Sequence, residues 1–180
     1  MSIKKYNLLK ELLYWSYSNL VMIHVALKEG TKTLEVKHYK IRSRFYKEFI
    51  NGKRKIGSFI KEYDSLKKSR ECAYCGNKSG LTLDHIFPKK IIKWESSDNI
   101  IFACKKCNSS KGKKDLLEWY HGKSSKLSIT AFRRYLKLSI DYCKRNNLME
   151  IPLELAKDRN LPFSIDYLEE NIPNISKLKL

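Results

Sequence analysis

The chain has 180 residues, of which 42% are hydrophobic and 31% charged, so it can bury a core and need not be disordered. Lysine and arginine number 37 against 19 aspartates and glutamates, which gives a formal net charge of +18. A surface this basic repels itself unless it meets a polyanion, and nucleic acid is the first candidate, ahead of an anionic membrane surface. A lysine-rich composition without functional meaning is the alternative explanation.

The first apolar segment predicts a helix over residues 4–27. Apolar side chains recur at helical spacing from Leu8 to Leu27, and Gly30 ends the pattern. The most apolar part, Leu12 to Leu27, is interrupted by polar residues such as His24 and is shorter than the stretch of about 20 apolar residues that spans a bilayer. We therefore expect a buried amphipathic helix and no membrane segment. No secretory signal is visible, so a cytoplasmic location is expected.

The next segment is expected to be helical and basic. Residues 31–37 are ambiguous and would suit a short strand, whereas residues 41–50 have the apolar spacing of a helix, which an asparagine–glycine pair ends. A further helix is expected over residues 58–69. Residues 1–70 carry 17 basic and 6 acidic side chains, so this N-terminal region is the expected main electrostatic contact with a polyanion.

The C-terminal region, residues 120–180, again has helical spacing. Ser128 is suited to cap a helix that runs to about Asn146. Pro152 breaks the pattern, and a last helix is expected over residues 165–171. Glycine and proline are scarce, at 7 and 4, so these patterns favour a mostly helical chain over a turn-rich sandwich.

Two C-x-x-C pairs lie in the middle of the chain, Cys72 with Cys75 and Cys104 with Cys107. Paired cysteines in a reducing compartment indicate a metal before a disulfide, and two such knuckles supply the thiolates of one tetrahedral zinc site. The 28 residues between the pairs exceed the usual ribbon interval of about 15–20, so an inserted segment is expected. A redox dithiol is the alternative. Cys143 lies on an apolar helical face and is expected to be a buried thiol.

The inserted segment predicts a hairpin followed by a helix. Residues 81–83 alternate and lead into Asp84 and His85, after which a proline ends the strand. Residues 99–103 suggest a second strand after a polar loop. A single helix is expected over residues 105–119.

The order of these motifs resembles the HNH endonuclease family, in its four-cysteine, zinc-bearing form with the ββα-metal fold. The matching residues are C-x-x-C at 72–75, L-D-H-I-x-P at 83–88, D-N at 98–99 and C-x-x-C-N-x-x-K-G at 104–112. The likeness covers about a quarter of the chain. It implies a zinc-clamped ββα-metal core at residues 71–119. Together with the helical patterns on either side, this predicts an α+β fold, mostly helical, with a basic helical region at 1–70 and a helical region at 120–180.

The resemblance implies a role for each of four residues. His85 would be the general base, because a neutral imidazole can take a proton from water near neutral pH. Asp84 and Asn108 would hold one Mg²⁺ or Mn²⁺, because oxygen ligands suit hard cations. Asn99 would brace the loop backbone and so orient His85. Each of the four has a simpler alternative as a turn, capping or core residue.

Lysines cluster at the expected helix after the second strand. Lys111 lies one turn after Asn108 and would reach a phosphate oxygen next to the metal. A phosphate-binding helix and a solvated basic face explain this cluster about equally well. The candidate DNA contacts are Lys105, Lys106, Lys111, Lys113 and Lys114.

The loop between the two strands departs from the family pattern. The family often has a glycine soon after the proline, whereas this chain has Ile91, Ile92 and Trp94 in that loop. We expect these apolar side chains to pack on the flanking helices.

The leading interpretation is a DNA endonuclease, most naturally acting on double-stranded DNA, with zinc as scaffold only, since four thiolates leave no open position for water. The alternative is a non-catalytic zinc-ribbon DNA-binding protein. That alternative explains the cysteines and the charge but not the joint presence of the candidate site residues. By analogy such a core suggests restriction or phage defence. A palindromic target would favour a homodimer, and a partner protein is the other possibility.

Overall fold

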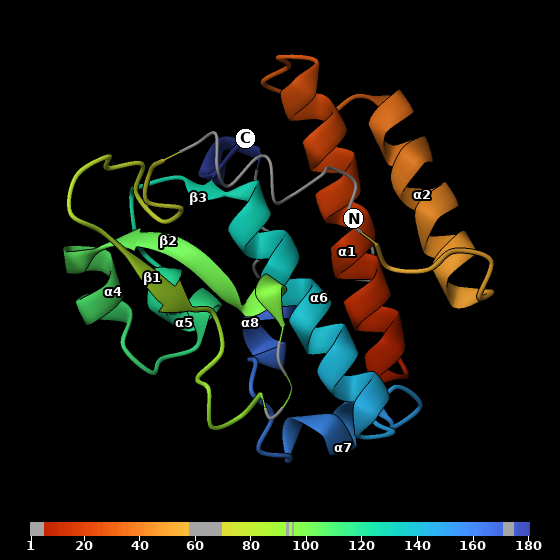
Figure 1. The fold of residues 1–180 in the computed structure, drawn as a ribbon. Helices are drawn as coiled ribbons and strands as arrows, with labels where there is room; N and C mark the ends of the chain where they lie inside the picture. The colour runs from red at the N-terminus through yellow and green to blue at the C-terminus, as the bar shows by residue number, and fades with distance from the viewer. Residues whose placement is uncertain (1–5, 58–69, 93, 95, 171–174) are drawn as a thin grey trace.

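The computed structural model describes residues 6–57, 70–92, 94, 96–170 and 175–180, and it has the expected α+β character with helix predominating (Figure 1). The elements in chain order are α1 (Leu9–Lys28), α2 (Val36–Ile50), β1 (Leu81–His85), η1 (Ser97–Asn99), β2 (Ile100–Cys104), α4 (Lys105–Lys111), α5 (Leu116–Tyr120), β3 (Leu127–Ser128), α6 (Ile129–Arg145), α7 (Leu153–Lys157), α8 (Ile165–Glu170), η2 (Ile175–Lys177) and β4 (Leu178–Lys179). The helix expected over residues 58–69 lies outside the described residues.

Helices α1 and α2 lie side by side at one end of the molecule (Figure 1). Aromatic rings join them: Phe49 stacks on Tyr14 with centroids 5.7 Å apart and meets Tyr17 edge-on at 5.6 Å. Both helices were predicted, with limits a few residues away from those observed. Among the described residues no helix, α1 included, has the length and apolar character needed to cross a bilayer.

The strand considered for residues 31–37 does not form, because α2 already begins at Val36 within that described segment. His38, in the first turn of α2, is fully buried. Its Nδ1 accepts a hydrogen bond from the amide of Glu35 at 2.9 Å, and its Nε2 donates to Oε2 of Glu29 at 3.0 Å. These contacts close the first helical turn and tie it to the end of α1.

Helix α6 occupies the centre of the fold. Ser128 Oγ accepts a hydrogen bond from the amide of Ala131 at 3.1 Å, which confirms the predicted cap, and the helix ends at Arg145. In Figure 1 α6 lies between the β1–β2 hairpin and α1, and it contacts both α1 and η1. The three regions therefore pack around one helix, and their division at residues 70 and 119 stays a prediction.

The C-terminal region contains a short helix and a pair of short strands that the sequence pattern did not indicate. Helix α7 follows Pro152, and β3 pairs in parallel with β4, with Leu127 opposite Leu178. This pairing brings the end of the chain beside the start of the zinc segment, where the ammonium of Lys179 contacts the carboxylate of Glu71. Helix α8 matches the expected last helix as far as the described residues reach.

Candidate metal centre and active site

Strands β1 and β2 form the predicted antiparallel hairpin. Leu81 pairs with Cys104 at one end and His85 with Ile100 at the other. The second strand begins one residue later than expected, because Asn99 is the last residue of the 3-10 turn η1. The pairing fixes one end of the hairpin at the cysteines and the other at the candidate active site.

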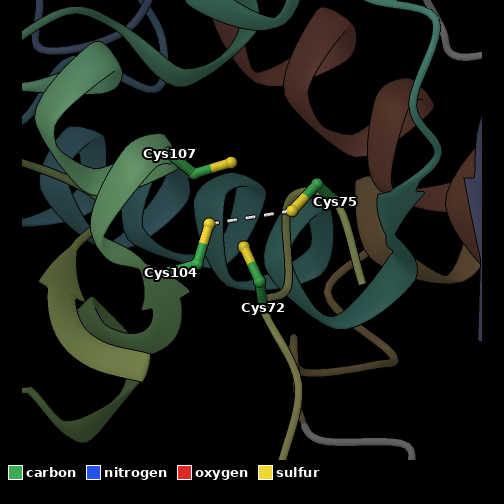
Figure 2. A group of neighbouring side chains, drawn as sticks. All are labelled: Cys72, Cys75, Cys104 and Cys107. Carbon is green, nitrogen blue, oxygen red and sulfur yellow. Dashed lines mark hydrogen bonds between the residues drawn. The ribbon is translucent and has the colours of Figure 1, made fainter. Parts of the chain in front are cut away.

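The four paired cysteines converge on one point (Figure 2). Their sulfur atoms all lie within 4.8 Å of one another, and Sγ of Cys75 is 3.8 Å from Sγ of Cys104. Zinc–sulfur bonds of about 2.3 Å in a tetrahedron require sulfur–sulfur distances of about 3.8 Å. The donor set therefore fits a structural zinc ion, as predicted. All five cysteines are free thiols, and Cys143 is buried as expected.

Backbone hydrogen bonds fasten both knuckles to the hairpin. The amide of Ala73 donates to the carbonyl of Phe102 at 2.9 Å, and the amide of Lys105 donates to the carbonyl of Gly80 at 3.0 Å. The amide of Ser128 donates to the carbonyl of Ala73 at 2.9 Å. A zinc ion here would thus lock the two strand ends, the start of α4 and the start of α6 into one unit.

The prediction of a single helix over residues 105–119 is wrong, because the chain forms two short helices there, α4 and α5. Helix α4 ends at Lys111, because the next residue, Gly112, has a φ of +52°, a backbone conformation that glycine adopts readily and that stops the helix. Asp115 then caps α5, accepting hydrogen bonds from the amides of Leu117 and Glu118. Tyr135 of α6 donates to the other oxygen of Asp115 at 2.6 Å, which ties α5 to the core.

Asp84 and His85 face opposite sides of the end of β1, as successive strand residues do. Asp84 is only 6% exposed and turns toward α4. Its Oδ2 accepts hydrogen bonds from the Tyr74 hydroxyl at 2.7 Å and lies 3.3 Å from Nζ of Lys111. Within the described residues both contacts of Asp84 fall on Oδ2, so Oδ1 is the oxygen open to a cation.

Asn108 of α4 lies against the same strand. Its Nδ2 donates to Oγ1 of Thr82 at 3.0 Å and to the carbonyl of Leu83 at 3.3 Å. With the amide nitrogen fixed on β1, Oδ1 is the atom that can serve as a ligand. Asn108 and Asp84 thus both lie at the contact between α4 and β1.

Lys111 has surroundings different from those expected. Its side chain is fully buried, and its Nζ donates to the carbonyl of His85 at 2.8 Å beside Asp84. The helix turns this residue inward, away from any DNA. Instead of contacting DNA, as expected, Lys111 joins α4 to β1. The other four candidate lysines are exposed on the protein surface: Lys105, Lys106, Lys113 and Lys114.

His85 is half-buried and lines a hollow on the side of the strand away from Asp84. Burial lowers the pKa of its imidazole below the ordinary 6.5, and the positive charges of Lys89 and Lys111 lower it further, while Asp84 opposes the shift. The ring is therefore neutral near pH 7, the form in which it accepts a proton.

Asn99 is buried and forms hydrogen bonds with the backbone of the two residues that follow His85. Its Oδ1 accepts from the amide of Phe87 at 2.8 Å, its Nδ2 donates to the carbonyl of Phe87 at 3.0 Å, and its own carbonyl accepts from the amide of Ile86 at 3.0 Å. These three bonds fix the path of the chain as it leaves β1.

Helix α6 supports this arrangement from behind, a contribution that sequence reasoning missed. Arg134 donates to the carbonyls of Ser97 and Ile100, and Lys137 forms an ion pair with Asp98 at 2.6 Å. The helix thereby holds η1, which carries Asn99. No local motif marks these contacts, because Arg134 is 37 residues from Ser97 and 34 residues from Ile100 in sequence.

The loop between the strands packs as expected at two of its three apolar residues. Ile92 is buried, and the ring of Trp94 lies 4.7 Å from the guanidinium carbon of Arg145 and close to Tyr142 of α6. Ile91 is 37% exposed.

Comparison with known proteins agrees with the resemblance. Residues 72–114 match the sequence model of a family described as HNH endonuclease. The match covers the two cysteine pairs, β1, β2 and α4, and none of the flanking helical regions. Neither the curated proteins nor the solved structures contain a match. Residues 72–114 are thus similar to the HNH endonuclease family, and they contain the four cysteines that can hold a metal ion.

Proposed function

We propose that this protein is a metal-dependent endonuclease that hydrolyses phosphodiester bonds in DNA. The observation that carries the proposal is that Asp84 and His85 lie at one end of a hairpin whose other end the four cysteines clamp, while Asn108 of α4 is hydrogen-bonded to the same strand. A binding module needs the clamp but has no use for an imidazole beside buried oxygen ligands.

The residues of the α4–β1 contact fit a hard cation. Oδ1 of Asp84 and Oδ1 of Asn108 are carboxylate and amide oxygens, the donors that Mg²⁺ and Mn²⁺ prefer. Such an ion, when bound, would polarise the scissile phosphate and stabilise the departing oxygen. Tyr74 and Lys111 hold Oδ2 of Asp84 and so keep the carboxylate in one orientation before the cation arrives.

His85 acts in this proposal as the general base. Its imidazole takes a proton from the attacking water, and its lowered pKa keeps it unprotonated near neutral pH. Asn99 and Lys111 act through the backbone, because they hold the peptide groups on either side of the histidine. Zinc takes no part in the chemistry, since four thiolates fill its coordination sphere.

Two basic surfaces are proposed to bind the DNA backbone. Lysines on the exposed side of α4 lie next to the candidate site. On the outer face of α2, Lys40, Arg44 and Lys47 lie one helical turn apart and line a shallow depression. Ammonium and guanidinium groups in such a row suit the repeating phosphates of a nucleic acid.

The biological role follows only by analogy. Restriction or phage defence suits a nuclease core with basic helical flanks, and a palindromic target would call for a homodimer. The alternative, a zinc-ribbon DNA-binding protein without catalysis, would bind plasmid and leave it intact.

Supercoiled plasmid incubated with the purified protein tests the proposal. We expect nicking with added Mg²⁺ or Mn²⁺ and none with zinc alone. Retardation of plasmid in a gel without any cutting of plasmid, phage or methylated DNA by any divalent ion would favour the binding protein instead.

A further inference from the structure

A hollow of about 590 Å³ opens beside the imidazole of His85. Its walls come from the loop after β1, from η1 and from the start of β2, and they include His85, Lys89, Ile92, Trp94, Ser96 and Ser97. This volume lies in the range of about 300–1,000 Å³ that is typical of sites for small organic groups. The hollow is larger than an attacking water requires.

The aromatic wall of the hollow is held firmly. The guanidinium carbon of Arg145 lies 4.7 Å from the centroid of Trp94, and the ring of Tyr142 lies 6.5 Å from it. Both partners belong to α6, the central helix of the fold. Trp94 is only half-buried, so part of its indole surface remains open to a flat apolar group.

The remaining walls offer polar groups suited to a nucleotide. The Ser97 carbonyl and the backbone of η1 are fixed by Arg134, so the hydroxyls of Ser96 and Ser97 sit on a rigid turn. Hydroxyls can donate to or accept from the polar edge of a base. Lys89 is exposed and lines the hollow, so its positive charge would attract the phosphate of a nucleotide bound there.

We propose that this hollow binds the base of a nucleotide next to the scissile phosphate, with the base unstacked from its neighbours and stacked on Trp94. The inference rests on the proposed function, because it is the hydrolysis site at His85 that brings a nucleotide to the hollow. Unstacking a base is costly in a perfect duplex and costs least where the DNA is single-stranded or mismatched. The substrate class that follows is DNA that is single-stranded or locally opened at the cut.

The proposal is tested by comparing the wild-type protein with Trp94→Ala, each on intact oligonucleotides and on oligonucleotides that lack one base. Binding of fluorescent single-stranded pentadeoxynucleotides is measured by anisotropy without added divalent ion, with an abasic residue moved through each position in turn. Base–aromatic stacking is worth about 1–3 kcal/mol, so Trp94→Ala should weaken binding about tenfold, and Trp94→Phe about twofold. At one position the abasic residue should remove the difference between the wild-type protein and Trp94→Ala.

The outcomes separate this inference from the nuclease proposal. Equal affinity of the wild-type protein and Trp94→Ala for every oligonucleotide would overturn the base pocket, even if plasmid is nicked. Coupling between Trp94 and one base, without any cutting of plasmid or of single-stranded DNA in Mg²⁺ or Mn²⁺, would support the pocket and contradict catalysis. Retained zinc in Trp94→Ala shows that the variant is folded, because all four cysteines must be in place to hold the ion.

Discussion

The ammonium of Lys111 lies 3.3 Å from Oδ2 of Asp84, and both side chains are buried. The same ammonium donates to the carbonyl of His85 at 2.8 Å. One lysine of α4 therefore contacts both of the strand residues to which the chemistry is assigned. It joins helix to strand, a position that leaves it no access to DNA.

The first prediction concerns the contact of Lys111 with Asp84 and with the carbonyl of His85. Lys111→Met should lower the free energy of unfolding by about 3–5 kcal/mol, because removing one partner of a buried ion pair leaves the other charge uncompensated. Urea unfolding of the zinc-loaded protein measures the change. Lys113→Met, at an exposed position two residues on, should stay within about 0.5 kcal/mol of wild type. Unchanged stability of Lys111→Met together with lost DNA binding would instead favour the phosphate contact expected from the sequence.

The second prediction concerns the zinc centre. Purified protein should contain about one zinc ion per chain, and Cys75→Ser should lose the ion and unfold the segment around it, since structural zinc contributes to folding directly. Metal analysis and circular dichroism follow the two effects. Cys143→Ala is the matched control: it removes a buried thiol away from the cluster and should keep its zinc. Full zinc occupancy in Cys75→Ser would contradict the four-thiolate site.

The third prediction concerns the basic face of α2. Lys40→Ala and Lys47→Ala should each weaken plasmid binding and reduce the salt slope of the binding constant by about 1, because each removes one phosphate contact. Binding titrations at several salt concentrations give the slope. Lys157→Ala on α7 removes the same charge elsewhere. If all three variants behave alike, the charge acts only through the net field of the protein.

The fourth prediction concerns pH and His24 of α1. Burial lowers the pKa of His24 from 6.5 to about 4, with Lys28 and Arg133 adding to the shift. Between these two pH values the unfolded chain binds a proton that the folded chain does not, so stability falls as the pH falls. The side chain is partly exposed, so solvent screening reduces the loss at pH 5 to about 1 kcal/mol.

His24→Gln should remove that part of the loss. Urea unfolding of both proteins at pH 7.5 and pH 5 measures it, and only the difference between the proteins is compared, since zinc release affects both. An equal loss in the two proteins would show that His24 is not responsible for it.

The sequence predicted the paired cysteines and the strands of the hairpin because each C-x-x-C pair and each strand has a local sequence pattern. The spacing in each C-x-x-C pair defines a knuckle, and the alternation at residues 81–83 defines a strand. Ser128 was recognisable as a cap for the same reason, since its partner lies three residues away.

Long-range partners account for what the sequence did not reveal. In the sequence Lys111 cannot be distinguished from the exposed lysines near it. Only the fold shows that it is buried against Asp84, which lies 27 residues earlier in the chain. The sequence predicts one continuous helix through Gly112, and it does not indicate that the positive φ of this residue ends α4 there. Arg134 donates a hydrogen bond to the carbonyl of Ser97, and β3 pairs with β4. Both interactions join segments that are far apart in sequence, so no local pattern predicts them.

The single-turnover rate of plasmid nicking by His85→Ala tests the central claim most directly. Both proteins are used at equal zinc content, in the same Mg²⁺ concentration and in excess over the plasmid. Loss of a general base typically costs about 10²–10⁴-fold, so His85→Ala should cut at least about a hundredfold more slowly than the wild-type protein while binding plasmid equally well. A His85→Ala protein that nicks as fast as the wild type would contradict the assignment of this hairpin as the catalytic centre.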